Sequence, residues 1–544
     1  MALSSTLADP QIVGLSQLLE DIRQGFMLIP RFQRPLIWSV EQQIELLNSI
    51  RDGVPIGSIL VWRTRTHDIA CYDQIGRHRV EARGIGSGGV RQYVLDGFQR
   101  LSTLYSALHQ EDATADADED APHFFLDLES KQFVAGGTQP DEKHLFPMAV
   151  LLNRMELLRR ERRFDKELWV ENAEEVFGAF DRYKIPVIPL ITEDFQMATR
   201  SFERVNRMGE KVSRLHVVHA LTWSGTFNLL AEVTALKEEH LAPQGWGELD
   251  DEVVLETCAL LLGLSVYEMT EEHLAQKLRA DPQALKRAID ALEMAAAVLK
   301  WQGLSSPELV PYSRQIVLLA AAVFRAAARS DNGADMLDHL ATWLWLTTYS
   351  ELFAGISGGR FKRVHEQLQA TMETGRLAWP GWRPFSRRPL PARYDFRSAR
   401  GKALALRLVE QKPKLPDGSE IQLQWTSGAD HLRNSVVQIV PRTRISAASF
   451  ASAGNRFLVP PEYAAAFRSE LISIHVDPTA EQVEQRRAWL ASHVVSEKAL
   501  RLLDTGSLEA FVRQREADLN ALEQAFVERH LAILDEGTPD ISAD

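Results

Sequence analysis

The sequence of 544 residues is short of cysteine, of long apolar runs and of positive charge, and each shortage excludes a class of protein. Its two cysteines, Cys71 and Cys258, lie far apart and form no metal-ligand pattern, so we expect idle thiols in the reducing cytoplasm. No stretch approaches about 18 uninterrupted apolar residues. The N-terminus has no basic segment before an apolar run. We therefore expect neither a membrane span nor a signal peptide.

The charge balance limits the function further. Lys and Arg number 61 against 74 Asp and Glu, which gives a formal net charge of −13. This balance excludes a protein that coats nucleic acid through its overall charge, but it leaves room for a local basic groove. The length suggests roughly three domains.

The most informative stretch covers residues 93–104 and reads Tyr-Val-Leu-Asp-Gly-Phe-Gln-Arg-Leu-Ser-Thr-Leu. Three residues of high β-propensity lead into Asp-Gly, after which leucines recur at helical spacing. The polar residues Asp96, Gln99 and Arg100 are therefore expected where a strand ends and a helix begins. Backbone N–H groups and the helix dipole favour a phosphate at such a junction.

Several roles are open to these residues. Gly97 allows a tight turn and a close approach of a ligand to the backbone. Arg100 can contact phosphate with two hydrogen bonds. Asp96 can hold a ribose hydroxyl, a metal-bound water or the arginine itself. The simpler alternative is a β-turn with a surface Asp–Arg pair, because Asp-Gly is a common turn signal.

Two further stretches accompany the central one. Residues 29–39 read Ile-Pro-Arg-Phe-Gln-Arg-Pro-Leu-Ile-Trp-Ser and repeat the Gln-Arg pair in an extended, proline-bounded segment. Residues 202–213 read Phe-Glu-Arg-Val-Asn-Arg-Met-Gly-Glu-Lys-Val-Ser. The three ordered stretches together are a more specific signal than any one of them.

This set resembles the motifs of the GmrSD-type restriction endonuclease N-terminal domain. That family has a ParB-like nuclease/NTPase fold and occurs in prokaryotic defence proteins, including SspE-like ones. Its pattern runs Ile-Pro-x-x-Gln-Arg-x-x-x-Trp, then Asp-Gly-x-Gln-Arg-Leu-x-Thr, then Phe-x-x-x-Asn-x-x-Gly-x-x-Leu-Ser. Val212 stands where the family usually has leucine, which is a conservative departure.

The resemblance implies an NTP of unspecified base as cofactor, with Mg²⁺. It implies Asp96, Gln99 and Arg100 as the catalytic group. The nucleotide-binding residues that it implies are Arg31, Gln33, Arg34, Gly97, Asn206 and Lys211. Asn206 has an alternative role, which is to stabilise its own turn.

Periodicity predicts the remaining elements. Helices are expected over 11–28, after a capping box of Ser39 with Gln42, over 147–180 and almost throughout 214–375. A turn into a buried strand is expected over 55–62, and strands are expected over 123–128 and 185–190. The fold class is therefore α+β. With the resemblance, we expect a ParB-like α/β domain at 1–213, an all-helical domain at 214–378, a basic linker at 379–415 and a mixed α/β HNH-like domain at 416–544.

The family often continues into an HNH-like nuclease domain with a Glu-His-Ile-x-Pro motif and a later Gly-Asn-Leu segment. Here residues 437–441 read Val-Gln-Ile-Val-Pro, and Asn455 lies in Gly-Asn-Arg. Gln438 stands where the family has the histidine that acts as general base, so this alignment gives a degenerate site. His431, preceded by Asp430, is the alternative catalytic histidine in a shifted frame.

One segment is strongly basic. Residues 383–414 contain ten Lys or Arg against Asp395 and Glu410. This is the best candidate for a contact with the DNA backbone, and its candidate DNA-binding residues are Arg387, Arg388, Arg393 and Arg397. The alternative is a solvated linker paired with acidic faces elsewhere.

These observations support three hypotheses. The first is an NTP-dependent DNA-defence protein, which the resemblance directs toward modified DNA or DNA lacking a modification. The second is a non-enzymatic sensor with an inactive nuclease domain, which recruits an effector protein. The third makes the ParB-like domain itself the nuclease, although Asp96 is the one obvious carboxylate of its motif. Self-association is compatible with all three.

Overall fold

A computed structural model of the chain describes residues 8–31, 33, 38–75, 78–80, 89–109, 122–136, 143–205, 214–222, 227–327, 333–381, 383–422, 428–473 and 479–534. The chain divides into two compact units, Met1–Leu230 and Ala231–Asp544, which we call the N-terminal and the C-terminal unit. In the described ranges, none of the helices is both long and apolar enough to cross a membrane.

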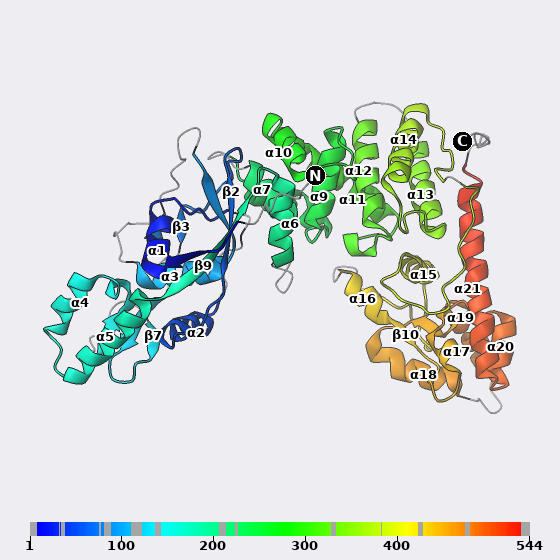
Figure 1. Ribbon diagram of the computed structural model, residues 1–544. Helices are drawn as coiled ribbons and strands as arrows, with labels where there is room; N and C mark the ends of the chain where they lie inside the picture. Colours follow the sequence, from blue (N-terminus) through cyan, green and yellow to red (C-terminus); the bar gives the residue numbers. More distant parts are fainter. Residues whose placement is uncertain are drawn as a thin grey trace. The chain divides into compact units, whose positions relative to one another are not determined.

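The N-terminal unit is built on a four-stranded sheet (Figure 1). The strand order is β1 (Gln11–Gly14), β9 (Lys184–Ile191), β2 (Ile59–Thr64) and β5 (Arg91–Asp96). Strand β2 runs parallel to β9, whereas β1 is antiparallel to β9 and β5 is antiparallel to β2. This arrangement places the end of β5, and thus Asp96, at one edge of the sheet.

Four helices share the apolar core of this unit with the sheet. They are α1 (Leu15–Arg23), α2 (Val40–Arg51), α3 (Phe98–Leu108) and α5 (Glu167–Asp181). Helix α3 is nearly surrounded, since eight of its eleven residues are buried. The residues after β5 are therefore held by packing on several sides.

The other elements of the unit are short. A second sheet has the order β7-β6-β8. The remaining bounds are β3 (Gln74–Ile75), β4 (His78–Arg79), β6 (His123–Asp127), β7 (Phe133–Gly136), β8 (Leu145–Pro147), α4 (Arg154–Glu161), α6 (Phe195–Val205) and α7 (Arg214–Thr222).

The helix expected over 11–28 is wrong at both ends. Its first four residues form β1, because they pair with residues 184–187 of β9, a partner that no local pattern reveals. The helix then ends at Arg23, and Gly25 follows with a φ of 70°. The capping box of Ser39 with Gln42 is confirmed at the start of α2.

The C-terminal unit is mainly helical. The helix expected over 214–375 is confirmed as a series of helices, and the described residues from 231 to 374 contain no strand. The bounds are α8 (Leu229–Leu236), α9 (Asp251–Leu261), α10 (Glu271–Ala280), α11 (Gln283–Trp301), α12 (Ser313–Ala327), α13 (Gly333–Tyr349), α14 (Gly358–Thr374), α15 (Ala399–Glu410), α16 (Gly428–Ser435), α17 (Ala447–Ala451), α18 (Ala464–Ile472), α19 (Ala480–Ala491), α20 (Glu497–Asp504) and α21 (Leu508–Leu531).

One small antiparallel ribbon interrupts these helices. It consists of β10 (Val436–Gln438) and β11 (Arg456–Leu458), and Gln438 pairs with Arg456. An apolar cluster that includes Phe457, Trp489 and Phe511 packs around the ribbon. Helices and strands therefore coexist in the chain, which confirms the α+β class, while the domain limits at 213, 378 and 415 stay predictions.

The two cysteines are free thiols. Cys258 is buried in α9, and burial raises the pKa of its thiol to about 12. Burial likewise raises the pKa of the Cys71 thiol far above its ordinary value. Both are therefore protonated and poorly reactive at neutral pH.

Candidate functional site

The predicted strand–helix junction exists as β5 followed by α3. Gly97 precedes the helix with a φ of 96°, in the left-handed region that favours glycine. A Cβ atom there would collide with the side chain of Ile59 on the neighbouring strand. The pairing of β2 with β5 also shifts register between Leu60 and Val61, beside Asp96. Such bulges redirect side chains, and this one lies where Asp96 leaves the sheet.

Asp96 holds the arginine of its own motif. Its Oδ2 atom lies 2.9 Å from Nη2 of Arg100, and the two side chains are 28% and 17% exposed. Nη1 of Arg100 donates to the backbone carbonyl of Ile56 at 2.7 Å. A Cβ at Gly57 would come within 2.6 Å of that Nη1 atom, so the glycine makes room for the guanidinium. The pair is thus anchored to the loop before β2 and keeps partial access to solvent.

Two glutamines join the first and central motifs. Nε2 of Gln33 donates to the carbonyls of Val94 and Leu95, at 2.9 and 3.0 Å, and the side chain is only 7% exposed. Oε1 of Gln99 accepts a hydrogen bond from the backbone N–H of Trp38 at 3.3 Å. The structure therefore brings together two stretches that are about 60 residues apart in the sequence.

Arg31 lies beside the same motif but makes other contacts. Its Nε donates to the carbonyl of Cys71 at 3.0 Å, and its Nη2 lies 2.7 Å from Oδ1 of Asp73. Its guanidinium lies 5.6 Å from the ring centre of Tyr72, which stacks on Phe98 at the start of α3. The arginine is thus placed by a segment, residues 71–73, that the motifs do not include.

His219 on α7 is a second residue that the sequence pattern does not reveal. Burial lowers its pKa to about 4, and the positive charge of Arg31 acts in the same direction. The backbone of Ala70 donates to the carbonyl of Ala220, which ties α7 to the segment that holds Arg31. Asp73, Tyr72 and His219 carry no motif, so only the folded chain places them near the site.

Three predicted site residues, Arg34, Asn206 and Lys211, lie outside the described residues. Of the other nucleotide-site predictions, Asp96, Arg100, Gly97, Gln33 and Gln99 converge on the end of β5. Their assigned roles stay predictions.

The C-terminal motif residues turn toward the protein backbone. Nε2 of Gln438 donates to the carbonyl of Phe450 at 2.9 Å. Asn455 is fully buried, accepts from the N–H of Val440 at 2.8 Å and donates to the carbonyl of the same residue at 3.0 Å. His431 lies on α16, next to Asp430. The side chains of Gln438 and Asn455 thus close the loop between β10 and β11.

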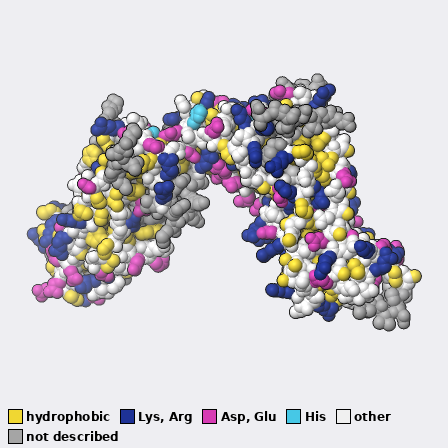
Figure 2. Space-filling view, turned by 45° about the vertical axis from the view of Figure 1, so that its right-hand side comes forward, with side chains coloured by type: hydrophobic (Ala, Val, Ile, Leu, Met, Phe, Trp, Pro, Cys, Tyr) yellow, Lys and Arg dark blue, Asp and Glu magenta, His cyan; other side chains and the backbone are white. Residues whose placement is uncertain are grey.

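The basic segment is only partly available to a ligand. Arg387 donates to Gln524 on α21 and lies 3.4 Å from the buried carboxylate of Glu523. Arg397 pairs with Asp395 at 2.8 Å but is 76% exposed, and Arg388 and Arg393 are exposed. In the view of Figure 2, basic and acidic side chains are interspersed over the described surface rather than gathered by sign.

Two of the ten basic residues in this segment are internal. Arg400 is 1% exposed and binds the carboxylate of Glu523 at 2.5 Å. Arg407 is 2% exposed, and its guanidinium lies 3.6 Å from the ring centre of Phe526. A count along the sequence therefore overstates the charge that this segment offers to DNA.

The described elements define an α+β protein whose N-terminal unit gathers polar residues at the end of β5. Residues 15–223 match the model of the GmrSD restriction endonuclease, N-terminal domain, which supports a GmrSD-type assignment for this part of the chain. An uncharacterized protein of Methanocaldococcus jannaschii is 21% identical over 407 residues, which cover 66% of this chain and 67% of the relative. Because 66% of the chain is more than residues 15–223, the likeness extends beyond the N-terminal domain.

Proposed function

We propose that the N-terminal unit binds and hydrolyses an NTP at the β5–α3 junction, as part of a restriction-like defence protein that engages DNA. The observation that carries this proposal is the Asp96–Arg100 pair. It combines a partly exposed carboxylate and guanidinium at a helix start. Backbone N–H groups at that position favour phosphate.

The residues of the junction divide into two groups under this proposal. Arg100 and Arg31 neutralise phosphate charge, which requires them to exchange their present carboxylate partners for phosphate oxygens. Gln33 and Gln99 are positioning residues, because their hydrogen bonds fix the first motif on the end of β5. Asp96 orients the attacking water once Arg100 has turned to the phosphate.

A Mg²⁺ ion fits this donor set. Mg²⁺ is usually held by one or two carboxylates together with substrate phosphates and water, and Asp96 offers one such carboxylate. When bound, the ion would supply charge neutralisation between neighbouring phosphate oxygens. The chain's own contribution is to hold the carboxylate at the end of a strand whose position the sheet fixes.

The second candidate function is a sensor whose C-terminal domain does not cut DNA. The hydrogen bonds of Gln438 and Asn455 favour it, since neither side chain offers a proton acceptor for an attacking water. In both functions the exposed residues Arg388, Arg393 and Arg397 are the proposed contacts to the DNA backbone.

The test measures NTP turnover by the purified chain, with and without DNA, alongside nicking of a plasmid. Asp96→Ala is expected to lower turnover at least about 100-fold, which is within the range for loss of a catalytic group. Asp52→Ala is the matched control, because Asp52 forms a comparable Asp–Arg pair with Arg51 on the surface.

The outcomes separate the hypotheses. Turnover that is equal in the Asp96→Ala variant and the parent would move the site away from the junction. Nucleotide binding without turnover or nicking would favour the sensor. Plasmid nicking that Asp96→Ala abolishes would make the N-terminal domain the nuclease, whereas nicking lost in His431→Ala would place the cutting site on α16.

A further inference from the structure

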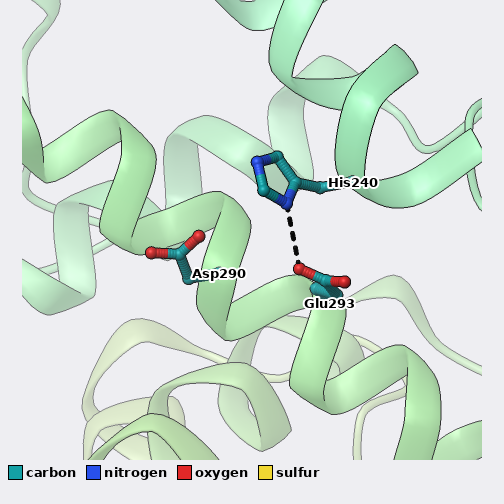
Figure 3. Close-up of side chains that lie close together, drawn as sticks. All are labelled: His240, Asp290 and Glu293. Atoms are coloured by element: carbon teal, nitrogen blue, oxygen red, sulfur yellow. Dashed lines mark hydrogen bonds and ion pairs between the residues drawn. The ribbon is translucent and has the colours of Figure 1, made fainter.

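A cluster of three metal-ligating side chains lies in the C-terminal unit, on elements that carry none of the motif residues described above (Figure 3). His240 belongs to a π-helical turn, η3 (Lys237–Leu241), that continues α8. Asp290 and Glu293 belong to α11. One ligand atom of each lies within 4.8 Å of the others. We propose that these three residues hold a first-row divalent transition-metal ion, with Zn²⁺ as the best match.

The backbone places the three side chains on facing surfaces. Residues 290 and 293 are three apart on a helix, so they lie on the same face. A π-helical turn inserts an extra residue into a helix and shifts the direction of the side chains that follow. Here the turn packs on α11 and brings Nδ1 of His240 to 3.1 Å from Oε2 of Glu293.

This spacing suits a bound ion. Two ligands at about 2.0–2.1 Å from a tetrahedral Zn²⁺ ion lie about 3.3 Å apart. The imidazole and the Glu293 carboxylate are therefore already separated as two such ligands would be. The Asp290 carboxylate needs a rotation about its own side-chain bonds to complete a three-residue site, which leaves the fourth position to water or another ligand.

The chemistry of the donors selects the class of ion. One imidazole with two carboxylates suits Zn²⁺, Mn²⁺ or Fe²⁺, whereas Mg²⁺ and Ca²⁺ prefer oxygen ligands alone. Gln244 donates to the second carboxylate oxygen of Glu293 at 3.2 Å, which orients that ligand as the outer partners of metal sites do. The three side chains are 21–38% exposed, so an ion can reach them from solvent.

Two contacts compete with the ion. Lys286 lies 3.4 Å from Asp290 and must move away. Without an ion, Nδ1 of His240 and Oε2 of Glu293 form a hydrogen bond that joins the two helices, and the ion must replace it. A metal site predicts saturable binding of one ion per chain in a titration, whereas a hydrogen bond alone predicts no binding.

The test uses the full chain, freed of metal with a chelator and then titrated with Zn²⁺ and with Co²⁺. We expect one ion per chain, a rise in the midpoint of thermal unfolding, and a Co²⁺ absorption band that Zn²⁺ displaces. His240→Ala, Asp290→Asn and Glu293→Gln should each weaken Zn²⁺ binding at least tenfold. His273→Ala, which removes an exposed histidine of α10, should bind as the parent does.

Glu293→Gln and Asp290→Asn keep the size of the side chains, so they test the proposal even where His240→Ala fails to fold. Absence of Zn²⁺ binding by the parent would overturn it. So would binding that survives Glu293→Gln or that is lost equally in His273→Ala. These readouts are independent of NTP turnover. The metal-site proposal is therefore tested separately from the function of the N-terminal unit.

Discussion

The matched N-terminal motif and the predicted C-terminal motif use their polar side chains in opposite ways. At the β5–α3 junction, Asp96 and Arg100 bind each other and stay partly exposed. At the β10–β11 ribbon, Asn455 is fully buried and binds backbone atoms only. A side chain that satisfies a buried backbone cannot be released without cost, whereas an exposed ion pair exchanges partners readily.

This difference separates a candidate site from a scaffold. The N-terminal motif presents groups that a ligand can take over, while the C-terminal motif keeps its shape by internal hydrogen bonds. Substitutions in the N-terminal motif should therefore change activity more than stability, whereas substitutions in the C-terminal motif should change stability more than activity.

Among the residues that bind the β10–β11 ribbon and its loop, Arg515 on α21 should be the one whose substitution destabilises the protein most. It is fully buried and donates to the backbone carbonyls of His493, Gly454 and Arg456 at 2.6–3.0 Å. Arg515→Met leaves these acceptors without a donor, so we expect a loss of about 3–5 kcal/mol in the free energy of unfolding. Urea unfolding followed by circular dichroism measures it. Arg513→Met, an exposed arginine of the same helix, is the control.

A loss below about 1 kcal/mol for Arg515→Met would contradict the scaffold role of the ribbon. It would mean that water or a rearranged loop satisfies the three carbonyls.

Asn455→Ala should have the next largest effect. It removes a donor and an acceptor that serve the buried backbone of Val440, which should cost about 2–3 kcal/mol. Asn434→Ala, on the exposed side of α16, should change the stability by less than about 0.5 kcal/mol. Equal unfolding midpoints for the two variants would show that Asn455 is free for another role.

The pH dependence of stability tests the buried histidines. Burial lowers the pKa of His493 to about 3, with the charge of Arg515 as a further cause, against 6.5 for the unfolded chain. The folded protein therefore keeps this histidine neutral while the unfolded chain takes up a proton. The stability it contributes is fully present above pH 6.5 and falls as the pH drops toward 3.

We expect the urea midpoint to decrease between pH 8 and pH 5.5, and the decrease to be smaller in His493→Gln. His273→Gln, at an exposed histidine, should keep the slope of the parent. Glu193 and Glu509 do not contribute to the slope in this interval, because hydrogen bonds lower their pKa values to about 2 and their contribution is lost only below about pH 4.5. A parent midpoint that is constant over the interval would contradict the buried neutral state.

The sequence predicted the features that depend on local patterns. The Asp96-Gly97 junction, the Ser39 cap and strand β9 follow from turn chemistry, capping residues and β-propensity. Long-range features were not predictable in this way. Strand β1 forms because of its pairing with β9, and Arg387 is drawn to Glu523, a residue more than 130 positions later. The local sequence around β1 does not indicate its pairing with β9, and the sequence around Arg387 does not indicate its contact with Glu523.

The candidate site shows the same division. The motifs identified Asp96, Arg100 and Gln33, but they gave no sign that Gln33 binds the end of β5 or that Arg100 binds the carbonyl of Ile56. Tyr72 and His219 joined the site only through tertiary packing. A motif thus predicts which residues matter, while their partners depend on the fold.

Asp96→Asn should have the smallest effect on stability. It tests most directly whether the N-terminal motif is a site and not a scaffold. The amide keeps the size of the side chain and one hydrogen bond to Arg100, and a partly exposed ion pair contributes about 1 kcal/mol or less. We therefore expect the urea midpoint to stay near that of the parent while NTP turnover falls at least about 100-fold, since the amide cannot orient water as a carboxylate does.

Gln438→Ala should show the converse, with a loss of about 1 kcal/mol in the free energy of unfolding and unchanged turnover, because its one hydrogen bond goes to the Phe450 carbonyl. If Asp96→Asn destabilised the protein as strongly as Asn455→Ala, both motifs would be scaffolds, and the site of any NTP chemistry would have to lie elsewhere.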